Sequence, residues 1–166
     1  MGFFRIKKVK GREYGYIVEN TWSKKGSRQK VMGYIGRVYR FSLVKNIDFF
    51  KYLNIENFQD YIEKNDKNKI IWDLVGWELH KFDVSSEIFT IDLGSKTIQK
   101  NKKNVILLIN EGFLCSLTLA NLLDFNPGRV EEIDGFNFAR AFVETGIKVP
   151  NEIFVGLFGK LYIKQN

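Results

Sequence analysis

The first 45 residues combine many cations with flat aromatic rings, the two kinds of side chain that bind nucleic acid through its backbone and its bases. Lys and Arg neutralise phosphate, while Tyr and Trp rings stack on bases or sugars. Twelve of these residues are Lys or Arg and two are Glu, a net charge of +10. Residues 46–166 hold 14 basic and 17 acidic groups, a net charge of −3. This asymmetry predicts a dedicated positive surface that faces a polyanion.

Three extended runs with two turns between them are expected to carry this surface. Residues 3–9, 13–22 and 28–34 have strand-like patterns, and residues 10–12 and 23–27 contain turn residues. An antiparallel meander of this kind places its turns at opposite ends of the central strand, roughly 30 Å apart. The candidate nucleic-acid-binding residues are Arg5, Lys7, Lys8, Lys10, Arg12, Tyr14, Tyr16, Trp22, Lys24, Lys25, Arg28, Lys30 and Arg37.

The pattern leaves open which face of the meander packs on the rest of the chain. Three strands cannot bury both faces alone, so one face must meet the body. Either the face with Tyr14, Tyr16 and Val18 or the face with Ile17 fits that requirement. Tyrosines on a small sheet can also belong to the core, and a run of charges can be a plain solvated surface.

The order of residues in this segment resembles a known family. The matching residues are Arg5, Gly11-x-x-Tyr14-x-Tyr16-x-Val18-Glu19-Asn20, Gly26-x-Arg28-Gln29-Lys30-Val31 and Tyr34-Ile35-Gly36-Arg37. They resemble the N-terminal segment of archaeal and bacterial DDE-class insertion-sequence transposases. The match covers residues 3–37, and it implies a portable DNA-contacting module without implying transposition. A transposase also needs three carboxylates around magnesium on a ribonuclease-H-like core, and the remaining residues are too few for the usual version.

Residues 46–166 are expected to form a mainly α-helical body. The pattern favours one broken or two short helices over 46–65, a mostly buried helix over 70–82, and a β-hairpin over 87–100. Residues 105–110 fit a strand or a helix, and Ser116 fits the N-cap of a helix ending at Leu123. The pattern of residues 134–144 and 151–163 predicts a pair of helices. A secondary basic cluster follows the hairpin and contains Lys96, Lys100, Lys102 and Lys103.

The C-terminal pair has the outline of a helix-turn-helix, but its second helix is mostly apolar. A recognition helix presents polar side chains to base edges, which residues 151–162 lack. The pattern favours core or subunit packing. Gly156 and Gly159 would permit close helix approach, so the sequence predicts a possible homodimer through these helices.

The sequence contains no recognisable catalytic or metal-binding set. With one histidine, His80, and one cysteine, Cys115, it cannot assemble a zinc site of Cys and His ligands or an internal disulfide. Cys115 is expected to be a buried, inert thiol. The segment from Gly33 to Gly36 lacks the Lys-Ser/Thr of a phosphate-binding loop. The carboxylates without a recognisable site are Asp73, Asp92, Asp124, Glu131 and Glu132. We therefore predict no catalytic residue, metal or cofactor.

These observations predict an α+β protein: an N-terminal three-stranded basic sheet packed on a mainly helical body with one more β-hairpin. The expected units are residues 1–45 and 46–166, which can also form one compact domain. The favoured function is non-catalytic binding of double-stranded DNA through its backbone. The alternatives are an RNA- or ribosome-associated protein, a regulatory partner-binding protein, or an enzyme of unknown type. The charged start and the lack of a long apolar run predict a cytoplasmic protein without membrane contact.

Overall fold

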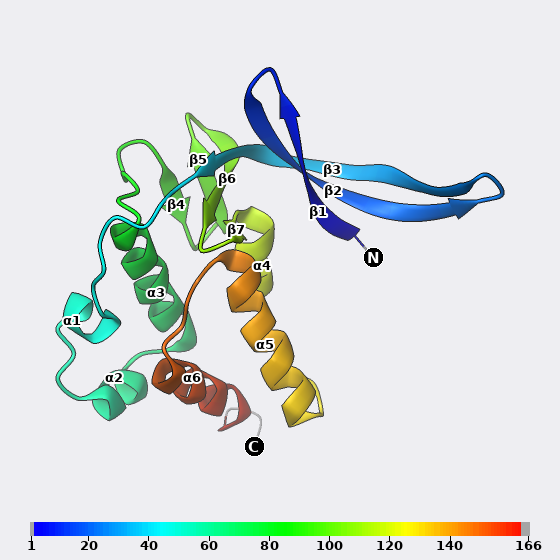
Figure 1. The fold of residues 1–166 in the computed structure, drawn as a ribbon. Helices are drawn as coiled ribbons and strands as arrows, with labels where there is room; N and C mark the ends of the chain where they lie inside the picture. The colour runs from blue at the N-terminus through cyan, green and yellow to red at the C-terminus, as the bar shows by residue number, and fades with distance from the viewer. Residues whose placement is uncertain (1, 164–166) are drawn as a thin grey trace.

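A seven-stranded mixed sheet and six helices make up the part of the chain, residues 2–163, that the computed structural model describes (Figure 1). The strands are β1 (Gly2–Val9), β2 (Arg12–Ser23), β3 (Gly26–Arg40), β4 (Thr90–Asp92), β5 (Thr97–Lys100), β6 (Lys103–Ile109) and β7 (Gly112–Leu114). The helices are α1 (Phe49–Leu53), α2 (Phe58–Lys64), α3 (Lys67–Lys81), α4 (Ser116–Leu123), α5 (Glu131–Thr145) and α6 (Asn151–Ile163). The α+β class predicted from the sequence is confirmed.

Strands β1, β2 and β3 form the expected antiparallel meander. Val9 pairs with Arg12 and Ser23 with Gly26, so each turn has two residues and the turns lie at opposite ends of β2. Lys10 and Gly11 both have positive φ, 49° and 77°, as a type I′ turn requires. The second turn, Lys24-Lys25, is followed by Gly26 at φ 104°, a conformation that favours glycine.

The prediction that this meander is a separate three-stranded sheet is wrong. The strand order is β1-β2-β3-β6-β5-β4, because residues 37–40 of β3 pair in parallel with residues 105–108 of β6. Strand β7 pairs with the end of β6. Parallel strands need a long connection, and here residues 41–102 supply it with α1, α2, α3 and the β4–β5 hairpin. A pairing between such distant segments leaves no local pattern in the sequence.

Two glycines make the β3–β6 pairing possible. Gly15 and Gly36 are register partners on β2 and β3, and both are buried. A Cβ atom on Gly36 would lie 2.5 Å from the Asn104 carbonyl oxygen and 2.9 Å from Val105 Cα. A Cβ on Gly15 would collide with Ile106 Cδ1. Strand β6 can therefore approach β3 only because these two positions lack side chains.

Strand β6 separates two apolar cores. Val105, Leu107 and Ile109 are buried in the larger one, with α3, α4, α5 and α6. Ile106 points the other way and is buried with Val38 and Cys115. Phe4, Ile6, Ile35, Leu108 and Phe113 pack around this smaller core, where the Phe4 and Phe113 rings stack at 5.0 Å. The meander face opposite Tyr14 and Tyr16 thus packs on the smaller core, whereas Tyr39, on the tyrosine face near the end of β3, packs against the larger one.

The helical predictions for the body are largely confirmed. Residues 46–65 form two short helices, α1 and α2, and residues 105–109 are strand. The predicted hairpin is present as β4 and β5 but is shorter, and α5 begins three residues earlier than expected. Cys115 rather than Ser116 is the N-cap of α4, because the Thr118 side chain accepts a hydrogen bond from the Cys115 amide at 3.2 Å.

A buried carboxylate ties α3 to two loops of the body. Glu78 is fully buried and accepts hydrogen bonds from Asn110 Nδ2 at 2.8 Å and from the Lys148 amide at 2.9 Å. Lys81 Nζ lies 3.2 Å from the same carboxylate and 3.8 Å from the centroid of the Trp77 ring. The β6–β7 turn and the α5–α6 loop are thereby fixed to one helix. Satisfied buried polar groups of this kind specify how elements dock.

The close approach expected from Gly156 occurs within the chain. A Cβ on Gly156 would lie 2.9 Å from Ile62 Cδ1, so α6 packs tightly on α2 at this position. A Cβ on Gly159 would have no atom of the described residues within 4 Å. Apolar residues do remain exposed on α5, where Ile133, Phe136 and Val143 are 57%, 69% and 70% accessible. The homodimer stays a prediction.

We expect Gly36→Ala to destabilise the protein, because the added methyl group meets the β6 backbone. Overpacking of this kind costs about 1–3 kcal/mol. At roughly 2–4 °C per kcal/mol for a chain of this size, the melting temperature should fall by several degrees in a thermal scan. Gly33→Ala is the matched control, since no atom lies within 4 Å of the new Cβ on the same strand. Equal melting temperatures for the two variants would contradict the proposed role of Gly36.

Candidate nucleic-acid interface

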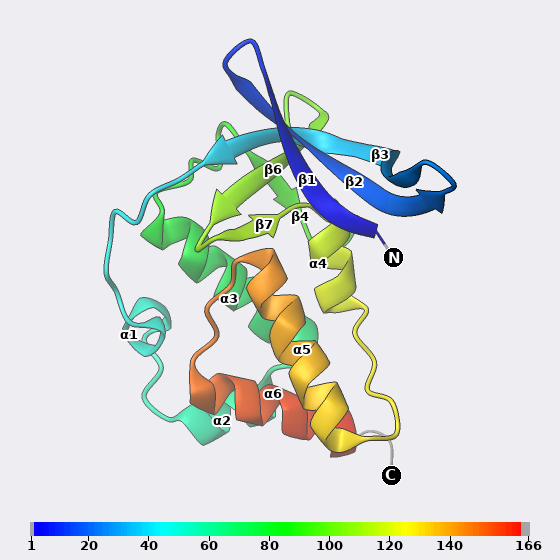
Figure 2. The ribbon, with the colours of Figure 1, turned by 45° about the vertical axis from the view of Figure 1, so that its right-hand side comes forward.

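Beyond residue 19 the meander narrows to a two-stranded ribbon. Among the described residues the last pair between β1 and β2 is Gly2 with Glu19, whereas β2 and β3 stay paired from there to Ser23 and Gly26. We call residues 20–29 the ribbon. Every residue from 20 to 32 is exposed, and the ribbon extends away from the helices (Figures 1 and 2). Both faces of this hairpin are therefore free to contact another molecule.

Short polar side chains shape the ribbon tip. Ser23 Oγ donates to the Gly26 carbonyl at 3.1 Å and accepts from the Lys25 amide at 3.3 Å. Thr21 Oγ1 donates to the Arg28 carbonyl at 3.1 Å. These bonds satisfy backbone groups at the turn, and Lys24 and Lys25 are both exposed. Trp22, 84% exposed, stands next to them.

The strand register divides the predicted residues between the two faces of the meander. Arg5 pairs with Tyr16, Lys7 with Tyr14, and Tyr14 with Arg37, so these cations share the tyrosine face. Lys8, Arg28 and Lys30 pair with Glu13, Thr21 and Glu19, which belong to the opposite face. The positive charge therefore surrounds the meander instead of following a single face.

In the part of the chain that the structure describes, two of the twelve Lys and Arg residues in the first 45 form ion pairs, Lys45 with Asp83 at 3.2 Å and Arg40 with Glu13. Arg40 donates from Nε and Nη2 to Glu13 at 2.5 and 3.0 Å, and this hydrogen bonding lowers the pKa of Glu13. Arg40 was not among the predicted contact residues. Within residues 2–163, none of the ten predicted Lys and Arg contacts forms an ion pair with Asp or Glu. Their charge remains available for an external anion.

A cavity of about 460 Å³ lies where the meander meets β5 and β6, and we call it the basic pocket. Its cations are Arg12, Arg37, Lys100 and Lys103, which come from four different strands. The remaining lining residues are Tyr14, Tyr34, Tyr39, Asn101, Asn104 and Val105. The structure thus brings part of the predicted N-terminal set together with part of the secondary basic cluster.

The Tyr39 ring contacts two of the four cations of the basic pocket. The Arg37 guanidinium lies 4.8 Å from the Tyr39 ring centroid, and Lys100 Nζ lies 4.9 Å from the same centroid. Tyr39 packs edge-on against the buried Phe89 at 5.2 Å. Burial, followed by the neighbouring tyrosines, raises the pKa of Tyr34. Its hydroxyl therefore keeps its proton at neutral pH and can donate a hydrogen bond.

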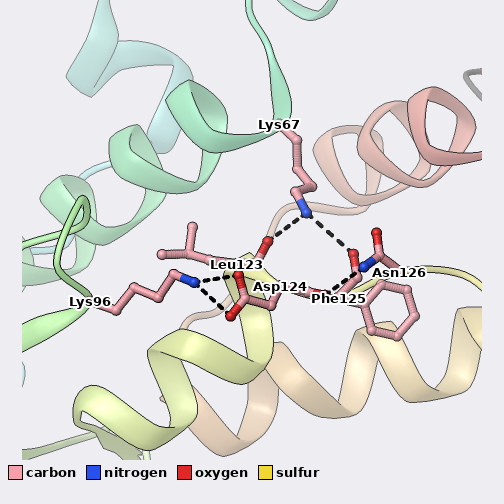
Figure 3. A network of polar contacts seen from close by, with 6 residues as sticks. All are labelled: Lys67, Lys96, Leu123, Asp124, Phe125 and Asn126. Carbon is pink, nitrogen blue, oxygen red and sulfur yellow. Dashed lines mark hydrogen bonds and ion pairs between the residues drawn. The ribbon is translucent and has the colours of Figure 1, made fainter.

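The secondary basic cluster is not a single site. Lys100 and Lys103 line the basic pocket, and Lys102 is exposed in the turn between β5 and β6. Lys96 instead contacts both carboxylate oxygens of Asp124, at 2.5 and 2.6 Å (Figure 3). Beside this pair Lys67 donates to the Leu123 carbonyl at 2.6 Å, so both lysines stabilise the C-terminal end of α4.

The acidic candidates do not converge on a reaction centre. Asp73 is buried and accepts hydrogen bonds from Tyr61 at 2.8 Å and Lys69 at 2.5 Å. Between residues 2 and 163 no three His, Cys, Asp or Glu side chains are close enough to hold a metal ion. Cys115 is buried, and burial raises the pKa of its thiol. Tyr39 and Asn104 were missed as site residues because their role depends on the β3–β6 pairing.

Comparisons with protein-family models, with curated proteins and with solved structures find no match to this chain. The resemblance of residues 3–37 to DDE-class transposases therefore stays a prediction. Among the described residues, no helix is long and apolar enough to cross a membrane.

The exposure of Trp22 can be tested by fluorescence quenching. We expect iodide to quench the tryptophan fluorescence of the protein more strongly than caesium does, because the neighbouring Lys24 and Lys25 concentrate anions at the ribbon tip. Trp22→Phe should remove most of this iodide-sensitive emission. Trp72→Phe is the control, since Trp72 is 45% exposed on α3, far along the chain from the lysine turn. Unchanged iodide quenching in Trp22→Phe would contradict the arrangement of the tip.

Proposed function

We propose that this protein binds double-stranded DNA non-catalytically, with the ribbon as its main contact. The observation that carries the proposal is the form of the ribbon: two paired strands, exposed on both faces, with three cations and a tryptophan near the tip. The body covers neither face, and nothing in the fold of the described residues requires a projection of this kind for packing.

A two-stranded ribbon has suitable dimensions for the major groove of B-DNA. That groove is about 12 Å wide and admits a helix or a pair of β-strands. The ribbon is four residue pairs long, roughly 13 Å at about 3.3 Å per residue. Its cations extend from the tip (Lys24 and Lys25) and from one face (Arg28). Phosphates line both walls of the major groove. Lys24, Lys25 and Arg28 are therefore suited to backbone contacts on either side of the groove.

The rest of the meander extends the positive surface beyond the ribbon. Lys10 and Arg12 lie at the opposite end of β2, and Arg5 and Lys7 lie between the two turns on the tyrosine face. Lys7 Nζ is 5.1 Å from the Tyr16 ring centroid, so this face presents cations and rings together. Phosphate contacts of this kind position a protein without selecting bases. We therefore propose binding with weak sequence preference.

RNA is the alternative target, and the exposed rings favour it. Trp22 is 84% and Tyr34 58% accessible, and an exposed ring can stack on an unpaired base. Duplex DNA is preferred here because the ribbon has the form of known major-groove readers, whereas the deep, narrow major groove of A-form RNA excludes side chains.

The test compares wild type with the triple variant Lys24→Gln, Lys25→Gln, Arg28→Gln on duplex DNA across a salt series. Each lost phosphate contact should reduce the salt slope by about 0.9, so the slope should fall by up to roughly 2.7. Affinity at low salt should drop by at least about tenfold, since charged hydrogen bonds contribute roughly 1.5–3 kcal/mol each.

The control variant Lys51→Gln, Lys64→Gln, Lys148→Gln removes the same charge from exposed positions in α1, α2 and the α5–α6 loop. It should retain nearly the wild-type salt slope. Absence of duplex binding at low salt, or equal losses in the two triple variants, would overturn the proposal. Duplex RNA and single strands are measured in parallel, and tighter binding to either would replace DNA with RNA or single strands as the target.

A further inference from the structure

The basic pocket holds more positive charge than one backbone phosphate requires. Arg12, Arg37, Lys100 and Lys103 line it, and no Asp or Glu is among its described lining residues. An internal phosphodiester carries one negative charge, whereas a phosphate monoester carries about −1.5 to −2 at pH 7 and offers three acceptor oxygens. Four cations around one cavity therefore suit a monoester better than a diester.

The pocket is also large enough to hold more than the phosphate. Its volume of about 460 Å³ falls within the roughly 300–1,000 Å³ typical of small-molecule sites. The Tyr14 and Tyr34 rings line it with their centroids 6.4 Å apart, and Tyr34 is largely exposed. Such rings can stack on a base. Asn104, held by a 3.2 Å hydrogen bond from Gln99, adds an amide at the rim.

The pocket is preorganised by the fold. Arg37 and Lys100 flank one ring, Tyr39, which is anchored on the core residue Phe89. The Gly36 approach to Asn104 fixes the β5–β6 turn against β3, so Lys103 is held near Arg37. Cations held in place before binding lose little conformational freedom when the ligand arrives.

We infer that the basic pocket binds the phosphate monoester of a nucleotide, either at the 5′ end of a strand or on a free nucleotide. In the form that involves a strand end, the inference rests on the proposed nucleic-acid binding. Arg12 and Arg37 supply bidentate donors to the phosphate, Lys100 and Lys103 balance its charge, and Tyr34 or Tyr14 stacks on the attached base.

The experiment measures binding of short 3′-labelled single-stranded DNA that carries either a 5′-phosphate or a 5′-hydroxyl. Wild type should prefer the phosphorylated strand by about tenfold, the effect of one or two charged hydrogen bonds. Lys100→Gln with Lys103→Gln should reduce this preference to near unity. Lys24→Gln with Lys25→Gln removes the same charge from the ribbon. This variant should bind both strands more weakly but keep the preference for the phosphorylated one. Lys103→Gln alone, at an exposed position, is the second variant in case the pair unfolds.

Competition with a nucleoside 5′-monophosphate separates the two sources of the monoester. Displacement of the phosphorylated strand by the free nucleotide assigns the pocket to nucleotides in general, and failure to displace it assigns the pocket to strand ends. Equal binding of the two strands by wild type, with no binding of the monophosphate, would overturn the inference. A preference that survives in both pocket variants would overturn it as well. Duplex binding that depends on Lys24 and Lys25 is scored separately, so either proposal can fail alone.

Discussion

The close approach of β3 and β6 is the constraint on which the rest of the structure depends. It requires that Gly36 and Gly15 lack side chains, because the Asn104 carbonyl and the Ile106 side chain occupy the space that Cβ atoms would need. Once β6 is in place, its alternating residues serve two cores, Val105 and Leu107 toward the helices and Ile106 toward the meander. The same contact brings the β5–β6 turn to the basic face of β3. Packing and the candidate pocket thus share one cause.

The ribbon, by contrast, is defined by exposure and not by close packing. Its residues bury little surface, since within residues 2–163 β1 pairs with β2 only as far as Glu19 and every residue from 20 to 32 is exposed. Exposed strand edges invite pairing with other chains, and charged residues on them oppose it. The charges of Lys24, Lys25, Arg28 and Lys30 oppose such pairing, and the proposed DNA binding uses the same charges, so the two requirements do not conflict. Hydrogen bonds from Ser23 and Thr21 to the backbone keep the hairpin ordered without a core beneath it.

The meander could be predicted from the sequence because its determinants are local. Turn residues such as Gly11 and Gly26 and the alternation around Tyr14 and Tyr16 act over a few positions, and the helix at 151–163 was predicted for the same reason. The β3–β6 pairing could not be predicted, because Arg37 and Val105 are brought together only by the whole intervening chain. From the sequence alone, Tyr39 is therefore an ordinary strand residue, and Lys100 and Lys103 belong to a separate cluster. Charge and composition group the cations only by their position along the chain, whereas the fold shows that some line a pocket, some lie on the ribbon, and Lys96 pairs with Asp124.

The two proposed sites lie at opposite ends of β2, and their spacing relates them to one ligand. Arg12 belongs to the pocket and Ser23 to the ribbon tip, so the ends are at most about 36 Å apart at roughly 3.3 Å per residue. One turn of B-DNA is about 34–36 Å long. A duplex that runs along β2 with its 5′ end at the pocket would present the same face of the helix to the ribbon one turn further in. Arg5 and Lys7, which lie between the two ends, would then follow the intervening phosphates. If both proposals hold, a DNA end would be a better ligand for the whole surface than an uninterrupted duplex, because only an end supplies the phosphate monoester that four clustered cations favour.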